Sequence, residues 1–345
     1  MSMSARTPLV SILVPAYNAA RFLPGFCQSV QAQTYPHYEV LIGDDGSSDD
    51  TSSVLAPFLK DNRFQLVAWQ PNRGLAAGMA VLYASVRGEY WCATGADDLF
   101  CPSFLEKRLG KLEANPRAFL VHGPPELIDE SGKPVQSSHP LLDLPPQLSA
   151  PRSLEVLLQH DIINAPSVMG RSSVTRQVLP FFHWEWEYSP DWFLWILHAA
   201  TGFDLLWDPR VLSKYRVHSG SLSLTPKKNH LRRAEVRLMP LIGLRTAAQF
   251  SHWAALAWSR WGRTLYWRWL RQAVALKARG GLRDEWIQLA AHAYYGARGK
   301  RASLWLELAK HSLGVVAADL MHGRAMKRQS FRVSGLAQLG DPIFR

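Results

Sequence analysis

Short apolar runs alternate with amphipathic stretches along the first hundred residues of the chain. The runs are rich in β-branched or aromatic residues, which is typical of buried strands, and they occupy residues 9–14, 40–42, 64–68 and 90–93. Stretches in which apolar residues recur at helical spacing separate them, at residues 20–31 and 76–86. This alternation predicts an α/β fold with a mostly parallel sheet flanked by helices.

Polar residues follow three of the four runs, at the points where the strands would end. Asp44 and Asp45 come directly after the second run, Asp97 and Asp98 follow the fourth, and residues 15–18 follow the first. In parallel α/β sheets the ligand binds beyond the carboxyl ends of the strands, so we expect these segments to meet in one crevice. Crowded carboxylates repel one another unless a cation or hydrogen-bond donors meet them. The pattern therefore indicates a nucleotide and its metal.

Six short motifs resemble the successive blocks of family 2 glycosyltransferases of the GT-A fold. In chain order they are VSILVPAYN (10–18), GDDGSSDDT (43–51), NRGL (72–75), RGEY (87–90), ADD (96–98) and YRVHSGS (215–221). The resemblance covers about residues 8–225. It implies an inverting enzyme that moves a sugar from a nucleoside diphosphate sugar, with a UDP-sugar as the expected donor. The acceptor would be a glycan or a lipid-linked glycan in bacterial cell-surface polysaccharide biosynthesis.

The resemblance also implies which residues hold the donor and its metal. Asp45 or its neighbour would accept hydrogen bonds from the nucleotide base, although Asp-Gly-Ser-Ser is also typical of a surface turn with a helix cap. The cation would be Mg²⁺ or Mn²⁺, which offsets the charge of the departing diphosphate. His218 would reach the cation or the diphosphate, and Arg216 would pair with the phosphates or with a nearby carboxylate. The donor set is Pro15, Tyr17, Asn18, Asp44, Asp45, Asn72, Gly74, Asp97 and Arg216, and the metal set is Asp97, Asp98 and His218.

The general base is expected in a later segment, residues 183–195, where the resemblance implies Asp191. An acceptor hydroxyl is a poor nucleophile until a base takes its proton, and a carboxylate at the cleft floor can do so. Asp191 could equally cap the helix that follows Pro190, and both roles are compatible. Tryptophans in this segment could stack on sugar rings or fill the core. The predicted acceptor-binding residues are Trp184, Glu185, Trp186 and Trp192.

Two departures from the family pattern support an alternative function. Many relatives carry an acidic residue where this chain has Gly95, and often an Arg-Asn pair where it has Met79 and Ala80. These differences concern the contacts to ribose and uracil and leave the carboxylates on the metal side in place. The alternative is a catalytically degenerate GT-A fold that acts as a binding or scaffold protein.

Charge divides the chain into two regions. Residues 1–226 carry 17 Lys and Arg against 22 Asp and Glu, whereas residues 227–345 carry 22 against 6. We therefore predict a GT-A domain over 1–226, with a nucleotide-binding half at about 8–105 and an acceptor half at 106–226, followed by a basic, Trp-rich helical region over 227–345. Residues 258–274 have the pattern of an amphipathic basic helix, which would lie on an anionic membrane or pack on the catalytic domain. No nucleic-acid motif accompanies the charge, so no nucleic-acid partner is expected.

Cysteine content and hydropathy indicate a cytoplasmic protein. Cys27, Cys92 and Cys101 lack metal-binding spacing and are expected to be reduced thiols. Residues 1–7 form no apolar signal segment, and no apolar run reaches the roughly 18 residues that a membrane span needs. The predicted location is the cytoplasm, with peripheral attachment to the cytoplasmic face of the inner membrane if the basic helix binds lipid. The sequence carries no signal for an oligomeric state.

Overall fold

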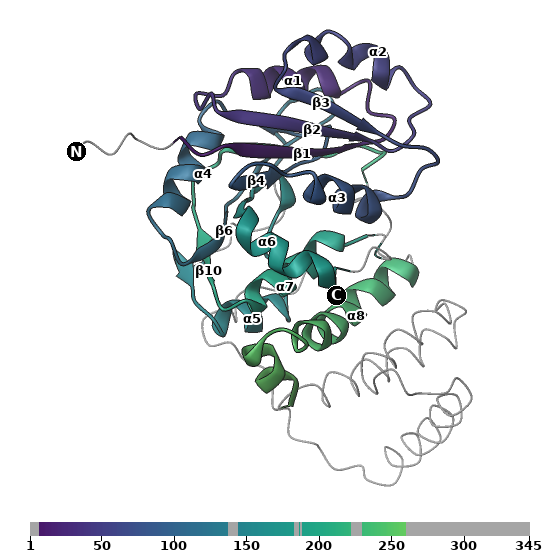
Figure 1. Cartoon of the computed structure of the whole chain (residues 1–345). Coiled ribbons are helices and arrows are strands. Elements are labelled where there is room, and N and C mark those ends of the chain that lie inside the picture. Colours follow the sequence, from purple (N-terminus) through teal and green to yellow (C-terminus); the bar gives the residue numbers. More distant parts are fainter. Residues whose placement is uncertain (1–6, 137–143, 183–185, 187, 222–229, 260–345) are drawn as a thin grey trace, which may run out of the picture.

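A computed structural model describes residues 7–136, 144–182, 186, 188–221 and 230–259 of the chain. Its centre is an eight-stranded sheet with helices on both faces (Figure 1). In spatial order the strands are β3 (Phe64–Ala68), β2 (Tyr38–Asp44), β1 (Val10–Ala16), β4 (Tyr90–Ala93), β9 (Met169–Arg171), β6 (Ala118–His122), β10 (Asp204–Trp207) and β8 (Gln147–Leu148).

The sheet is mostly parallel, which confirms the predicted fold class. β1 pairs in parallel with β2 and β4, β2 with β3, and β10 with β6. β9 runs antiparallel between β4 and β6, and β8 runs antiparallel at the edge. Because β9 is antiparallel to both β4 and β6, β6 and β10 run in the same direction as β1 to β4. All of these strands therefore end at the same edge of the sheet.

β2 is longer than the apolar pattern predicted, and it contains a charged residue that is paired. β2 begins at Tyr38 and includes Glu39, which is buried in the centre of the sheet. Its carboxylate accepts hydrogen bonds from Ser11 Oγ at 2.6 Å and from Arg87 Nε at 2.6 Å. A buried carboxylate is tolerated when such donors replace its water. The charged position therefore joins β1, β2 and the start of β4 instead of interrupting a strand.

The sheet separates two hydrophobic cores, because alternate residues of a strand point to opposite faces. Leu13 of β1 lies in one cluster and its neighbours Ile12 and Val14 lie in the other. One face is covered by α1 (Leu23–Gln31), α2 (Thr51–Leu55) and α4 (Phe104–Glu113). The other face is covered by α3 (Leu75–Ala84), α5 (Arg152–Leu157), α6 (Ser172–Val178), α7 (Pro190–Ala200) and α8 (His230–Ala247).

A second, three-stranded sheet forms beside the carboxyl end of β4. It orders β5 (Leu99–Phe100), β11 (Ser213–Arg216) and β7 (Glu126–Ile128), with β11 antiparallel to β5 and parallel to β7. Single-turn 3-10 helices lie at Phe58–Lys60, Ala165–Ser167 and Leu179–Phe181, and residues 252–259 are also helical. The small sheet brings the late motif at 215–221 next to Asp97 and Asp98, across more than a hundred residues of chain.

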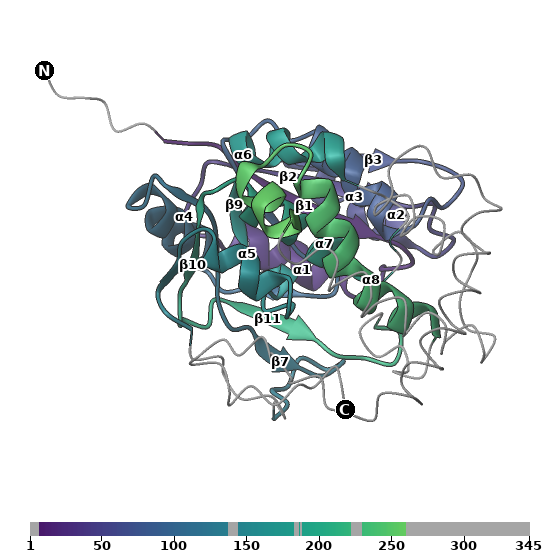
Figure 2. The same ribbon diagram turned by 90° about the horizontal axis from the view of Figure 1, so that it is seen from below.

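The chain after residue 226 begins with α8, which lies along α7 in both views (Figures 1 and 2). At Gly243 a Cβ atom would lie 2.9 Å from the Ile196 side chain, so the glycine permits this close approach. The proposed division at residue 226 stays a prediction. Of the predicted helix 258–274 only Trp258 and Ser259 lie within the described residues. No helix among the described residues is long and apolar enough to cross a membrane.

Candidate active site

The loops that follow β1 and β2 are joined by hydrogen bonds, as the strand-end pattern predicted. Asn18 adopts a positive φ of 50°, its backbone N–H donates to Ser47 Oγ at 2.9 Å, and its Oδ1 accepts from Ser48 N at 2.8 Å. Asp44 is buried at the end of β2, and its Oδ1 accepts from Ser47 N at 2.9 Å. Tyr17 is exposed at the edge of this junction. Three predicted donor residues, Tyr17, Asn18 and Asp44, therefore lie in one place.

Asp45 binds the loop that contains Asn72 and Gly74. Its carboxylate accepts hydrogen bonds from Arg73 N at 2.6 Å, from Gly74 N at 2.9 Å and from the indole Nε1 of Trp69 at 2.5 Å. The structure thus brings Asp45, Asn72 and Gly74 together. The Asp45 carboxylate, which was predicted to accept hydrogen bonds from the nucleotide base, therefore already accepts three hydrogen bonds from the protein itself.

Trp69 is a residue that the sequence analysis missed. A Cβ atom added at Gly43 would lie 2.8 Å from its ring, and one added at Gly78 would lie 2.9 Å away. The two glycines therefore make room for the indole between β2 and α3. The sequence does place a bulky aromatic residue directly after the third apolar run, and it has glycines directly after the second run and in the helical stretch that follows the third. These residues were the available signal for this packing.

Asp98 connects the acidic motif to β11. It is buried, and its two carboxylate oxygens accept hydrogen bonds from Arg216 N at 2.9 Å and from Gly95 N at 3.1 Å. Burial and the neighbouring charge of Asp97 raise the pKa of the Asp98 carboxyl, and the two backbone amides oppose that rise. Asp98 therefore holds β11 against the loop after β4, whereas the Asp97 side chain is partly exposed to solvent.

Asp97 and His218, two residues of the predicted metal set, lie in contact and are called the metal-side pair below. Nε2 of His218 lies 2.9 Å from Asp97 Oδ2, and both side chains remain partly exposed. Among the described residues no group of three or more His, Cys, Asp or Glu could hold a metal ion by itself. Mg²⁺ is commonly held by one or two protein ligands together with substrate phosphates and water. A carboxylate and an imidazole in contact fit a cation bound in this way.

Arg216 and Phe22 support the His218 loop. The Arg216 guanidinium donates to the backbone carbonyls of Asp97 at 2.8 Å and Asp129 at 2.8 Å. These partners differ from the phosphate or carboxylate that the sequence suggested. The Phe22 ring lies 4.8 Å from the His218 ring and 5.1 Å from the Arg216 guanidinium, measured between ring centroids and from the guanidinium carbon. Phe22 was not identified from the sequence, because an aromatic residue before a helix looks like ordinary core.

Gly95 determines where the Asp97 carboxylate can lie. A Cβ atom at position 95 would lie 2.3 Å from Asp97 Oδ1, so any side chain there would force the carboxylate to move. The glycine therefore leaves Asp97 free to point at His218. Met79, the other departure from the family pattern, packs against the larger hydrophobic core.

Asp191 is the second residue of α7, and its Oδ1 accepts a hydrogen bond from Trp192 N at 2.9 Å. Burial raises the pKa of Asp191 to about 6. Burial, together with the charge of Asp191, raises the pKa of Asp161 well above its ordinary value. The two carboxyls therefore titrate as a pair. Asp161 was missed because it is a single acidic residue before an apolar pair, Ile162 and Ile163.

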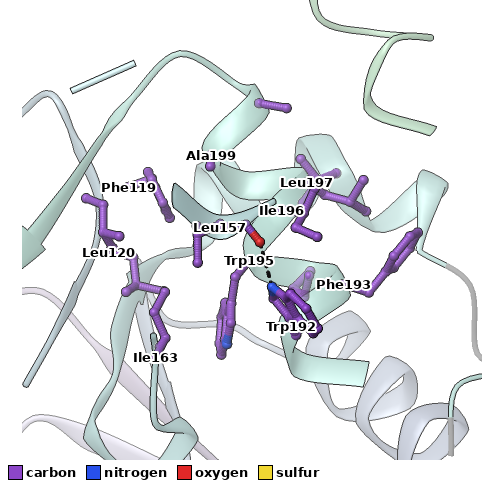
Figure 3. Close-up of a cluster of buried hydrophobic side chains, with 14 of the residues drawn as sticks. Phe119, Leu120, Leu157, Ile163, Trp192, Phe193, Trp195, Ile196, Leu197 and Ala199 are labelled. Atoms are coloured by element: carbon purple, nitrogen blue, oxygen red, sulfur yellow. Dashed lines mark hydrogen bonds between the residues drawn. The ribbon is translucent and has the colours of Figure 1, made fainter. Parts of the chain in front are cut away.

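The tryptophans near Asp191 that the structure describes are core residues. Trp192 is buried and donates from Nε1 to Leu157 O at 2.7 Å (Figure 3). Trp186 is also buried, with its ring 5.4 Å from that of Phe193. Of the two roles that the sequence allowed, packing is the one that these rings have here. The other predicted acceptor residues, Trp184 and Glu185, lie outside the described residues.

Solved structures share this architecture. S. aureus TarS 1–349 in complex with UDP-GlcNAc matches with a TM-score of 0.56 and 13% identity, over 83% of this chain and 87% of that chain. The mannosyltransferase PcManGT from Pyrobaculum calidifontis, in complex with GDP-Man and Mn²⁺, matches with a TM-score of 0.51 and 18% identity, over 93% and 89% of the two chains. At these identities the likeness shows the fold, which is the predicted one.

The chain is also similar in sequence to known glycosyltransferases. An uncharacterized glycosyltransferase of Haemophilus influenzae is 28% identical over 63% of this chain and 68% of its own length. The Escherichia coli UDP-Glc:alpha-D-GlcNAc-diphosphoundecaprenol beta-1,3-glucosyltransferase WfgD is 28% identical over 66% of this chain and 85% of its own. Residues 11–176, which include all three strand-end loops, match the family described as Glycosyl transferase family 2. Residues 11–176 therefore form a family 2 glycosyltransferase region, as the motifs predicted.

Proposed function

We propose that this glycosyltransferase moves a sugar from a UDP-sugar to a lipid-linked glycan acceptor, with inversion, in the assembly of a cell-surface polysaccharide. Relatives support the substrate classes: the E. coli relative uses UDP-Glc and a diphosphoundecaprenol-linked acceptor, and S. aureus TarS binds UDP-GlcNAc. The observation in this chain that carries the proposal is the set of hydrogen-bonded loops after β1, β2 and β3, together with the Asp97–His218 pair that Phe22 contacts from the segment after β1.

On the donor side, the residues of this chain would bind and orient the nucleotide sugar. The loops at Asn18, Asp44 and Gly74 meet beyond the ends of β1 and β2, where the nucleotide would bind. Asp97 and His218 would hold Mg²⁺ or Mn²⁺; Mn²⁺ is present in the Pyrobaculum mannosyltransferase complex. The cation, when bound, offsets the negative charge that develops on the departing diphosphate. Asp98 keeps the Arg216–His218 segment in position through the backbone of Arg216.

On the acceptor side, Asp191 would take the proton from the acceptor hydroxyl. A pKa of about 6 leaves its carboxylate mostly ionised near neutral pH and still basic enough to accept a proton. The hydroxyl oxygen then attacks the anomeric carbon on the face opposite the diphosphate, and the bond to the diphosphate breaks. A single displacement of this kind inverts the anomeric configuration.

The alternative of a degenerate scaffold rested on Gly95 and on Met79 with Ala80. The space around Gly95 accounts for the first departure, because the missing side chain is what lets Asp97 face His218. The metal-side pair and the base candidate are both present. Neither departure removes a group that the proposed reaction needs.

The test is a binding and transfer screen over UDP-, GDP- and TDP-sugars with and without Mn²⁺. We expect one UDP-sugar to bind most tightly, and nucleoside diphosphate to be released faster when a polyprenyl diphosphate-linked sugar is added. The matched control is Asp191→Asn, which should bind the same donor but release little diphosphate. If no nucleotide sugar binds the wild-type protein, the proposed function is wrong.

The basic C-terminal region would place the enzyme at an anionic membrane. In the last described helix, residues 252–259, Trp253 and Leu256 are 48% and 49% exposed, and residues 227–345 carry a large excess of Lys and Arg. Apolar burial and attraction to anionic lipid would then act together. We expect binding to anionic vesicles that weakens near 1 M salt, where the Debye length is about 3 Å. Equal binding to neutral vesicles, or none to anionic ones, would contradict this assignment.

A further inference from the structure

Glu235 is a buried carboxylate in α8, outside every motif described above. Its side chain is 0% exposed, and Oε2 accepts a hydrogen bond from the backbone N–H of Tyr188 at 2.7 Å. Burying a carboxylate costs free energy that an apolar side chain at the same place would not cost. The contact joins α8 to the segment that enters α7, across 47 residues of sequence. The position therefore calls for an explanation beyond packing.

The start of α7 is fixed on both sides of Asp191. Three residues before it, Tyr188 is held by Glu235 of α8. One residue after it, Trp192 donates from its indole to Leu157 O at the end of α5 (Figure 3). α7 itself packs along α8, as Figures 1 and 2 show. The backbone that carries Asp191 is thus positioned by two helices that contact it from different directions.

We propose that Glu235 is a positioning residue for Asp191, so that α8 supplies one residue on which the base depends. The inference rests on the proposed role of Asp191 as the base. Glu235 acts through the Tyr188 backbone and contacts no substrate. Without an acceptor for the Tyr188 N–H, the segment before α7 loses its hydrogen bond to α8, and Asp191 no longer holds a single position. Misplacing a catalytic group by about 1 Å can cost a hundredfold in rate.

The family match ends at residue 176, so neither Asp191 nor Glu235 lies within it. α8 also lies beyond the boundary at 226 that charge and motifs suggested. If Glu235 positions the base, truncation at that boundary would remove a part of the active site. The full chain is therefore the protein to test.

The experiment compares two substitutions of similar size. Glu235→Gln keeps an oxygen that can accept the Tyr188 N–H, whereas Glu235→Met fills the space without an acceptor. We expect Glu235→Gln to keep kcat within about threefold of wild type, and Glu235→Met to lower kcat by about tenfold to a hundredfold. The dissociation constant for the donor should stay within about twofold in both, because the donor loops lie on other elements. Hydrogen exchange should rise in the peptide that contains Tyr188 only for Glu235→Met.

Leu241→Ala is the matched control for a purely structural effect. Leu241 is a buried α8 residue in the same hydrophobic cluster as α7, so its truncation weakens the packing of α8 while the Glu235 carboxylate is kept. We expect a lower melting temperature with kcat close to wild type. If Leu241→Ala lowers kcat as much as Glu235→Met, Glu235 acts through stability alone and the inference is overturned.

Two further outcomes separate this inference from the proposed function. If Asp191→Asn abolishes transfer and Glu235→Met does not lower it, the positioning role is wrong and the function stands. If Asp191→Asn leaves transfer unchanged, the role of Asp191 fails, and the inference fails with it. Should Glu235→Met not fold, Glu235→Asp shortens the acceptor by one methylene. Unchanged kcat and unchanged exchange at Tyr188 in that variant would overturn the inference as well.

Discussion

The donor and acceptor sides of this site differ in which loops their carboxylates hold together, although burial raises the pKa of Asp98 on the donor side as it does for Asp161 and Asp191 on the acceptor side. On the donor side, Asp45 and Asp98 accept hydrogen bonds from backbone N–H groups of neighbouring loops, so the carboxylates organise the loops. On the acceptor side, Asp161 and Asp191 lie close together with few donors, and burial raises the pKa of both. In the proposed function, the donor side binds and orients the nucleotide sugar, and the acceptor side takes a proton from the acceptor.

The difference follows from what each side must do. A nucleoside diphosphate and a cation need a rigid frame of loops, which backbone hydrogen bonds supply at little cost. A general base needs a carboxylate with a pKa nearer neutrality, which requires removing donors and water from it. Each side would be unsuited to the task of the other.

The largest expected effect is that of Asp191→Asn. The amide keeps the size of the side chain but cannot take a proton, so transfer should fall by about a hundredfold or more. Donor affinity should not change, because the base meets only the acceptor. Steady-state transfer and donor binding by calorimetry measure the two quantities separately. A variant that transfers near the wild-type rate would move the proton-accepting role away from Asp191.

Asp97→Ala should break the donor side selectively. Removing one of two protein ligands should lower Mn²⁺ affinity by about tenfold to a hundredfold, and donor affinity should fall with it. Electron paramagnetic resonance of free Mn²⁺ and donor binding with and without chelator provide the readout. Glu106→Ala, at an exposed position on α4, is the control. Tight donor binding that ignores both chelator and Asp97→Ala would rule out a metal-dependent donor site.

The Asp191 carboxyl should also lower the stability of the folded protein at neutral pH. The pKa of Asp191 is about 6 in the folded protein against an ordinary 3.8, so the folded protein keeps a proton that the unfolded chain releases between those values. Stability therefore falls as pH rises through this window, by about 3 kcal/mol at most. Asp191→Asn removes that loss. Urea unfolding should show the variant gaining on wild type at about pH 8 relative to about pH 4.5. An equal difference at both pH values would show that the carboxyl is not perturbed.

The difference between the donor and acceptor sides also explains which residues could be identified from the sequence. The donor loops are contiguous motifs at strand ends, and β3 and β4 begin and end where the apolar pattern placed them. Trp69, Asp161 and Glu235 were missed because their contacts span long separations in sequence and depend on how helices pack. The role of Trp192 was left open for a related reason: a tryptophan suits a core or a sugar face, and only the packing of α5 against α7 decides between them.

The smallest expected effect concerns Phe22, which would sharpen the account of the donor side. Its ring lies against His218 and below the Arg216 guanidinium, so Phe22→Leu removes an aromatic contact worth about 0.5–1.5 kcal/mol. If that contact orients the imidazole toward Asp97, Mn²⁺ affinity should fall by about threefold to tenfold, with the transfer rate at saturating metal little changed. Phe58→Leu is the matched control, since Phe58 makes a ring contact with Phe64 on another part of the fold. Unchanged Mn²⁺ affinity in Phe22→Leu would mean that the backbone contacts of the 215–221 segment alone orient His218. The donor side would then depend on its hydrogen bonds without help from aromatic packing.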